Sequence, residues 1–343
     1  MMTTLRRVFL LLASVALGVV LVYLLIRIGK IDLRLTLLQL ESVRRVTFVK
    51  LVLLNGLLVY LSTAKWRSID AVLRRPSDSV PSRITSFAVT SAGMALGLIL
   101  PVQVGMTAAR TLGTYFYGRP LKRGTVGTLF EQSFDLLIVL FLSVSSGVTW
   151  FYSGGAVMWM ASAAAMTALA LLLVAPLIGL IRWAGASYSA RTAAPRNRIL
   201  RSFWELQHSS LLNAALARRL VMLSAVRFGV VVLMAGQTVE AIHAHIPLWH
   251  MAAAVPFVVI VTVIAVTPGG IGVNELTLAT ALKVFGTPLT VAAQWTLANR
   301  VLGTASCFAV AACAAIVWAV EKMTTSRTGD ANGKTRAEVQ GNV

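Results

Sequence analysis

The segment Thr-Pro-Gly-Gly-Ile-Gly at positions 267–272 lies in the middle of a long apolar stretch of the chain. Proline removes a backbone donor and clashes with the turn before it, and glycine loses the most conformational freedom in a helix. The sequence therefore predicts that one helix, about residues 248–266, ends here and that a second, about residues 273–285, begins. In a bilayer such a break is tolerated only where protein or water satisfies the freed backbone groups. We expect the break to lie inside the protein, beside polar groups.

A second break upstream has the same spacing. Pro101 is followed four positions later by Gly105, as Pro268 is followed by Gly272, and it too interrupts an apolar segment. Paired interruptions in corresponding places of two halves are the best sequence pointer to a transporter binding site, because the ends of half-helices carry partial charges that hold ions. The pair therefore favours a transporter over a protein with one kinked structural helix.

Composition indicates a polytopic membrane protein. Hydrophobic residues make up 57% of the chain and charged residues 13%, and several apolar runs are long enough to span a bilayer. The net charge of +19 does not predict a nucleic-acid partner, since the Lys and Arg residues fall mainly in short segments between apolar runs. We interpret these basic segments as topology determinants.

We predict an all-α polytopic bundle with about six full spans and two broken re-entrant hairpins. Arg6 and Arg7 precede the first apolar run, which we interpret as an uncleaved anchor with a cytoplasmic N-terminus. Residues 31–46 suit an amphipathic interfacial helix. Residues 1–320 are predicted to form a single transmembrane domain, followed by a disordered cytoplasmic tail at 321–343. The predicted full spans are 8–26, 47–64, 124–148, 157–181, 220–241 and 289–320.

The two hairpins are predicted to enter the bilayer from opposite sides. Basic clusters flank residues 84–117 and keep the first hairpin on the cytoplasmic side, whereas residues 243–247 lack Lys and Arg and place the start of the second hairpin outside. Each half, about residues 1–150 and 157–320, then makes an odd number of crossings. The halves would therefore form an inverted repeat.

Charged residues at membrane depth are the candidates for function, because a charge at the bilayer centre costs about 2.5–3.5 kcal/mol. Two interpretations of them remain open. They can be ion pairs that lock helices around the breaks, or they can line a polar cavity where arginines contact an anionic head group and acids contact a cationic group or a proton. Asn274 and Glu275 can equally be first-turn caps. The charged candidates are Arg110, Glu131, Asp135, Arg227, Glu275 and Arg300.

No metal or cofactor site is predicted. His243, His245 and His250 have no fixed helical spacing and no nearby Cys, which favours interfacial histidines over a metal site. Glu131 and Asp135 lack a His or Cys at ligand spacing, which counts against an intramembrane enzyme that uses a metal to act on a lipid phosphate.

At these motifs the chain resembles the flippase-like transmembrane region of lysylphosphatidylglycerol synthases and its stand-alone relatives. The most specific match is Pro-Gly-Gly-Ile-Gly-Val-Asn-Glu at 268–275, and the next is Glu-Gln-Ser-Phe-Asp-Leu at 131–136, similar to the family's Glu-Arg-x-x-Asp-Leu. Arg300 matches the family's late-helix arginine, and the likeness extends back to Gly29. The resemblance implies a helical bundle with re-entrant elements that moves a polar or aminoacylated lipid between leaflets.

The chain departs from the family pattern at the first break. Where the family has Pro-x-Arg-x-Gly-Glu, this chain has Pro-Val-Gln-Val-Gly-Met, so that Gln103 and Met106 replace two charged residues. Gln132 replaces the arginine that follows the first acid of the second motif. We expect these changes to bear on head-group selectivity in the first half, while the architecture is kept.

The expected function is transport of a phospho-, aminoacylated or prenyl-linked lipid across the bacterial inner membrane. The alternative is a non-catalytic accessory protein for lipid or cell-envelope polysaccharide synthesis, with the biosynthetic enzymes as partners. We do not expect an enzyme, because the longest segment outside the membrane, 182–219, is shorter than the roughly 50 residues of the smallest typical domain. The candidate cavity residues are Glu131, Asp135, Arg227, Pro268, Gly269, Gly270, Gly272, Asn274, Glu275 and Arg300, and those of the first break are Pro101, Gln103, Gly105 and Arg110.

Overall fold

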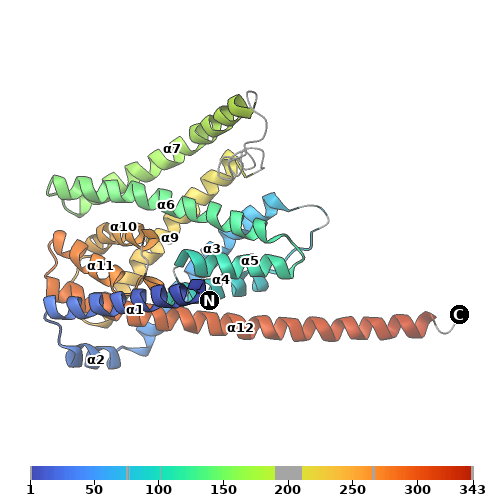
Figure 1. Ribbon diagram of the computed structural model, residues 1–343, viewed down its shortest axis with the longest axis horizontal. Coiled ribbons are helices and arrows are strands. Elements are labelled where there is room, and N and C mark those ends of the chain that lie inside the picture. The colour runs from blue at the N-terminus through green and yellow to red at the C-terminus, as the bar shows by residue number, and fades with distance from the viewer. Residues whose placement is uncertain are drawn as a thin grey trace.

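The computed structural model describes residues 2–74, 76, 78–100, 102–189, 211–264 and 267–340. All regular elements in these ranges are helical, which confirms the predicted all-α fold (Figure 1). The elements are α1 (Met2–Ile28), α2 (Leu33–Glu41), α3 (Arg45–Leu73), α4 (Arg83–Ile99), α5 (Val102–Phe116), α6 (Leu121–Phe151), α7 (Ala156–Ser189), α9 (Ala214–Ala241), α10 (Leu248–Ile264), the 3-10 turn η1 (Pro268–Gly270), α11 (Val273–Val284) and α12 (Leu289–Gln340).

The long helices fall where the full spans are predicted. Within the described residues, α3, α6, α7, α9 and α12 are long and apolar enough to cross a membrane, which makes 5 spans, or 6 if the bent pair of α1 and α2 counts as one. The bend between α1 and α2 is 98°, so α2 runs across the end of α1 in the manner expected of an interfacial helix. Asp32 caps α2 by accepting the backbone N–H groups of Arg34 and Leu35.

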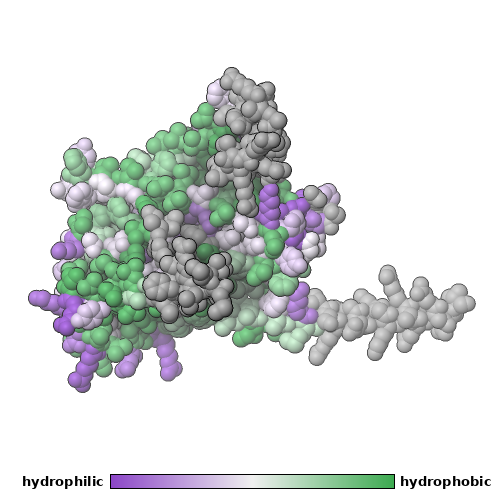
Figure 2. Space-filling model, viewed as in Figure 1, coloured by the Kyte–Doolittle hydropathy of each residue, from purple (hydrophilic) through white to green (hydrophobic). Residues whose placement is uncertain are grey.

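The distribution of hydropathy over the surface agrees with a membrane protein. Figure 2 shows a mainly hydrophobic band between hydrophilic residues at the two ends of the bundle. The long helices of Figure 1 run roughly along the line that joins these two ends. We therefore take this line as the direction across the bilayer.

The two hairpins occupy opposite halves of the bundle. In Figure 1, α10 and α11 lie in the half that contains the α1–α2 bend, whereas α4 and α5 lie in the half toward which α12 extends. Their tips are joined by a hydrogen bond in which the Gly269 backbone N–H donates to the Leu100 carbonyl over 3.2 Å. Helices α4 and α10 have 17 residues each, or about 26 Å, less than a hydrocarbon core of about 30 Å. Both end at a break and fall short of the full core thickness, and their re-entrant course stays a prediction.

The second break lies inside the protein, as expected. Thr267, Gly269 and Gly270 are buried, and Gly18 of α1 packs over the break. Three of its residues have positive φ, with 57° at Gly269, 69° at Gly270 and 80° at Gly272, a region that residues with a Cβ rarely adopt. Gly272 is the N-cap of α11, so the predicted half-helix terminus is present.

The first break differs from the second in one respect. Gly105 is not a half-helix terminus, as the matching spacing implied, but lies in the first turn of α5, which begins at Val102. A Cβ at Gly105 would lie 2.5 Å from the backbone N of Gly97, so the glycine allows α4 and α5 to pack backbone against backbone. Pro101 lies outside the described residues, as does the side chain of Gln103.

Two helices extend beyond the ends that their apolar runs predict. α3 continues to Leu73 instead of ending near residue 64, because Lys65 faces partners inside the bundle and does not mark a loop. α12 extends to Gln340, beyond the predicted end of the last span at residue 320, and the disordered tail at 321–343 stays a prediction. Most of the predicted basic loop, residues 190–210, lies outside the described residues.

Candidate functional site

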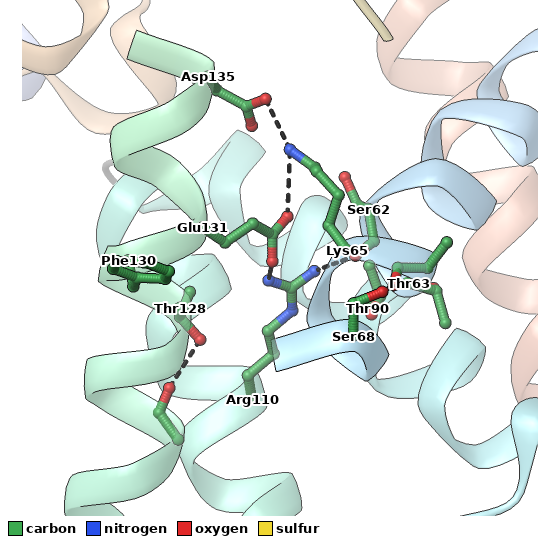
Figure 3. A network of polar contacts seen from close by, with 12 residues as sticks. Ser62, Thr63, Lys65, Ser68, Thr90, Arg110, Thr128, Phe130, Glu131 and Asp135 are labelled. Carbon is green, nitrogen blue, oxygen red and sulfur yellow. Dashed lines mark hydrogen bonds and ion pairs between the residues drawn. The ribbon is translucent and has the colours of Figure 1, made fainter. Parts of the chain in front are cut away.

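Charged side chains from three helices meet inside the first half of the bundle (Figure 3). Lys65 of α3 is fully buried, and its Nζ lies 2.6 Å from Oδ1 of Asp135 and 3.4 Å from Oε1 of Glu131. The two acids stand four positions apart on α6, so they share a helix face and can bind one ammonium together. Ser224 of α9 adds a longer contact, with its Oγ 3.4 Å from the same Nζ.

Arg110 of α5 extends this group of charges. It is fully buried, pairs with Oε2 of Glu131 and donates to the Ser62 carbonyl over 3.1 Å. Its guanidinium carbon lies 5.3 Å from the centroid of the Trp66 ring, which is within cation–π range. The re-entrant helix α5 is thereby fixed to α3 and α6.

Arg227 of α9 occupies the more open end of the group. Its Nη1 lies 3.3 Å from Oδ2 of Asp135, and the side chains are 28% and 19% exposed, respectively. The Nε of Arg227 is buried and has no hydrogen-bond partner in the described part of the chain. Arg227 therefore keeps part of its guanidinium exposed, while this buried donor is unsatisfied.

We call Lys65, Arg110, Glu131, Asp135 and Arg227 the Asp135 network. It contains three bases and two acids, so with ordinary protonation its formal charge is 3 − 2 = +1. Buried charges are tolerated where they are paired and hydrogen-bonded, and one unbalanced cation is costly unless an anion or water reaches it. The network therefore has the electrostatic character of an anion site at its exposed Arg227 end.

A second, smaller group holds the break in the second half; we call Glu275 and Arg300 the Glu275 pair. Oε2 of Glu275 accepts the Gly272 backbone N–H over 2.6 Å, and Oε1 lies 3.6 Å from Nε of Arg300. Nη1 of Arg300 in turn donates to the Gly269 carbonyl over 2.9 Å. Glu275 therefore caps α11, as one of the two sequence interpretations predicts, and the pair ties the break to α12.

A cavity of about 210 Å³ adjoins the Glu275 pair. It combines residues from both hairpins and from α12, so it lies where the hairpin tips meet. Asn274, which faces the cavity, accepts a hydrogen bond from Thr262 Oγ1 over 2.7 Å. A Cβ at Gly270 would lie 2.3 Å from Nδ2 of Asn274, so the glycine makes room for this amide. The cavity is lined by Leu98, Val258, Asn274, Glu275, Leu278, Thr296, Asn299, Arg300, Gly303 and Thr304.

The six charged candidates thus form two groups and not the single cavity that the sequence suggests. In both halves an ion pair joins the second arm of the hairpin to the span that follows. Arg110 on α5 pairs with Glu131 on α6, and Glu275 on α11 pairs with Arg300 on α12. In the first half the hairpin carries the base of the pair, and in the second half it carries the acid. The locking interpretation describes these two pairs, while Asp135, Arg227 and Arg300 keep partly exposed side chains.

Lys65 is the functional candidate that sequence reasoning missed. It stands at the end of an apolar run, where a lysine usually marks the membrane surface. The signal that could have revealed it is periodicity, since one face of α3 is buried at steps of three and four residues. The buried residues of that face are Leu51, Asn55, Leu58, Ser62, Lys65 and Ile69.

Metal-ligating side chains do not gather in the part of the chain that the structure describes. No three His, Cys, Asp or Glu residues there are close enough to hold an ion together.

The comparison with known proteins identifies a family. A family model described as the lysylphosphatidylglycerol synthase TM region matches residues 11–311, a range that contains both charged groups and both hairpins. No curated protein and no solved structure matches the chain. The chain therefore belongs to the lysylphosphatidylglycerol synthase TM region family.

Proposed function

We propose that this protein moves a lipid with a polar head group between the leaflets of a bilayer. The observation that carries the proposal is the contact between the tips of two hairpins from opposite ends of the bundle, with a polar cavity at the contact. Broken helices that meet near the midplane supply the internal polar surface that a head group needs. Membership of the family supports the proposal.

The Asp135 network and the Glu275 pair would provide the binding sites for the head group. Arg227 and Arg300 are the partly exposed cations, and each can offer guanidinium donors to a phosphate. Asp135, which is 19% exposed, would accept a cationic group such as the amine of an aminoacylated lipid. Acyl or prenyl chains would stay in the bilayer, since the side chains that face outward are mainly apolar.

In this proposal no covalent chemistry takes place in the protein. The proposed location of the protein is the bacterial inner membrane, with both termini in the cytoplasm. Its proposed partner is membrane lipid. The head group would bind by replacing an existing ion pair. A phosphate that reaches Arg227 competes with Asp135 for the same guanidinium. Such a competition keeps the buried charges compensated at every stage.

The test is exchange of fluorescent lipids in proteoliposomes, read by chemical quenching of the outer leaflet. Arg227→Gln removes the exposed cation and is expected to slow exchange by about tenfold or more, the size of one lost charge-assisted hydrogen bond. Arg227→Lys, which restores the charge, should recover part of the rate. Arg218→Gln is the matched control, because Arg218 is a neighbouring exposed arginine of α9.

Lipids with anionic, zwitterionic and aminoacylated head groups should be compared in this assay. If folded wild-type protein leaves the exchange of all three lipids at the background rate, the result contradicts the proposal and favours the accessory role. Exchange that is the same in wild type and in Arg227→Gln would remove the Asp135 network from the path.

A further inference from the structure

A second feature lies on the outside of the bundle, away from the two charged groups. A groove of about 860 Å³ runs between α3, α4 and α12. Most of its length is apolar, with Val52, Leu53, Phe87 and Val310 among the lining residues. Its remaining wall contains three arginines from three different helices, Arg67 of α3, Arg83 of α4 and Arg219 of α9.

The groove follows one face of α3 from the bilayer interior toward the end of the bundle. Its lining residues on α3 run from Val52 to Ala71, and Arg67 lies about 22 Å along the helix from Val52 at 1.5 Å per residue. This length exceeds the roughly 15 Å that one leaflet contributes to the hydrocarbon core. The apolar part can therefore accept acyl chains while the arginines stand at head-group depth.

The three groove arginines differ from other arginines at the same end, which have acidic partners. Arg119 pairs with Asp70 and Arg123 with Asp78. Among the described residues, no carboxylate forms an ion pair with any of the three groove arginines. Glu321 of α12 lies near this end of the groove, since its carboxylate accepts a hydrogen bond from Ser82, the residue before Arg83.

Arg67 is held in place before any ligand arrives. Its Nη1 donates to the Pro81 carbonyl over 3.0 Å and to Ser86 Oγ over 3.2 Å, and its other guanidinium donors have no partner among the described residues. A phosphate is the anion that fits such a fork, because guanidinium groups bind it with two parallel hydrogen bonds. Arg67 is two positions from Lys65, and residues at this spacing point to opposite faces of a helix, so the groove is separate from the Asp135 network.

We propose that this groove binds a two-chain acidic phospholipid, with its phosphate among Arg67, Arg83 and Arg219 and its acyl chains along the apolar wall. The site is independent of the proposed transport path and would act as a fixed lipid-binding site on the surface of the bundle. The three arginines favour an anionic head group, and the length of the apolar wall favours a membrane lipid over a soluble phosphate ester.

The test is native mass spectrometry of the purified protein with phosphatidylglycerol and phosphatidylcholine of identical acyl chains. Wild type should retain phosphatidylglycerol at least about tenfold better, the size of one charge-assisted hydrogen bond. The triple variant Arg67→Gln, Arg83→Gln, Arg219→Gln should lose this preference. The control Arg74→Gln, Arg182→Gln, Arg218→Gln removes the same charge from exposed arginines outside the groove and should keep it.

A second variant tests the apolar wall without changing the charge. Gly56 lines the groove, and a Cβ there would meet nothing within 4 Å, so Gly56→Leu is the variant chosen to fill the groove. It should lower phosphatidylglycerol binding while thermal stability is kept. Equal retention of the two lipids by wild type, unchanged retention in the triple variant, or displacement by millimolar glycerol phosphate would each overturn the proposal. Leaflet exchange is measured separately, so failure here leaves the transport proposal intact.

Discussion

At the scale of single residues, Lys65 is the centre of the charged interior. Its ammonium binds both acids of α6, so it keeps two carboxylates compensated at once. Removal of one partner from a buried ion pair is more harmful than removal of both, because the remaining charge has no water to compensate it. The structure thus makes a direct prediction about a residue whose position in the sequence suggests a surface role.

Replacement of Lys65 by methionine should therefore destabilise the folded protein. We expect a loss of about 1.5–3 kcal/mol, the size of a hydrogen bond to a charged group, because Glu131 keeps Arg110 and Asp135 keeps Arg227 when the ammonium is removed. Denaturant unfolding in detergent measures this loss. The double variant Lys65→Met, Asp135→Asn should lose less than the sum of the two single variants. Lys283→Met, at an exposed position of α11, is the control. A Lys65→Met variant as stable as this control would contradict the assignment.

At the scale of elements, the breaks depend on glycines that no other residue replaces. Gly269 has a φ of 57°, and a Cβ there would lie 2.2 Å from the Leu98 carbonyl oxygen of the other hairpin. The glycine therefore serves both the local turn and the contact between the hairpins. The same argument applies to Gly272, where a Cβ would lie 2.5 Å from the Gly18 carbonyl oxygen of α1.

Gly269→Ala should accordingly lower thermal stability, because it combines a strained backbone, which costs about 1–3 kcal/mol, with a clash against backbone atoms that cannot rotate away. Gly56→Ala is the matched control, since the added methyl group has open space and alanine is the better helix former. Thermal unfolding followed by circular dichroism measures both. Equal stability of the two variants would mean that the hairpins do not touch at Gly269.

The sequence predicts elements well where the signal is local. Proline and glycine define the break at 267–272, and the apolar runs locate the long helices, because both signals come from residues that are neighbours in the sequence. It fails where the deciding partner lies on another helix. α3 continues past Lys65 because two acids on α6 bind the lysine inside the bundle. Gly105 allows α5 to pack closely against α4, and no pattern within α5 alone reveals this contact.

At the scale of the whole molecule, the two halves repeat one plan with opposite charges. Each half carries a hairpin whose second arm is fixed to the next span by one ion pair, Arg110 with Glu131 and Glu275 with Arg300. The hairpins come from opposite ends of the bundle (Figure 1). They meet where the Gly269 N–H donates to the Leu100 carbonyl. This arrangement creates polar surface inside an apolar bundle, on which the proposed transport depends.

The most direct test of this arrangement is the sidedness of the loops that lead into the two hairpins. In a variant whose native cysteines are replaced, single cysteines are placed at Ser79, before α4, and at His245, before α10; both positions are exposed. A membrane-impermeant maleimide is then applied to intact cells and to inverted vesicles. The account predicts that Ser79→Cys reacts only in inverted vesicles and His245→Cys only in intact cells. Reaction of both cysteines from the same side would contradict it.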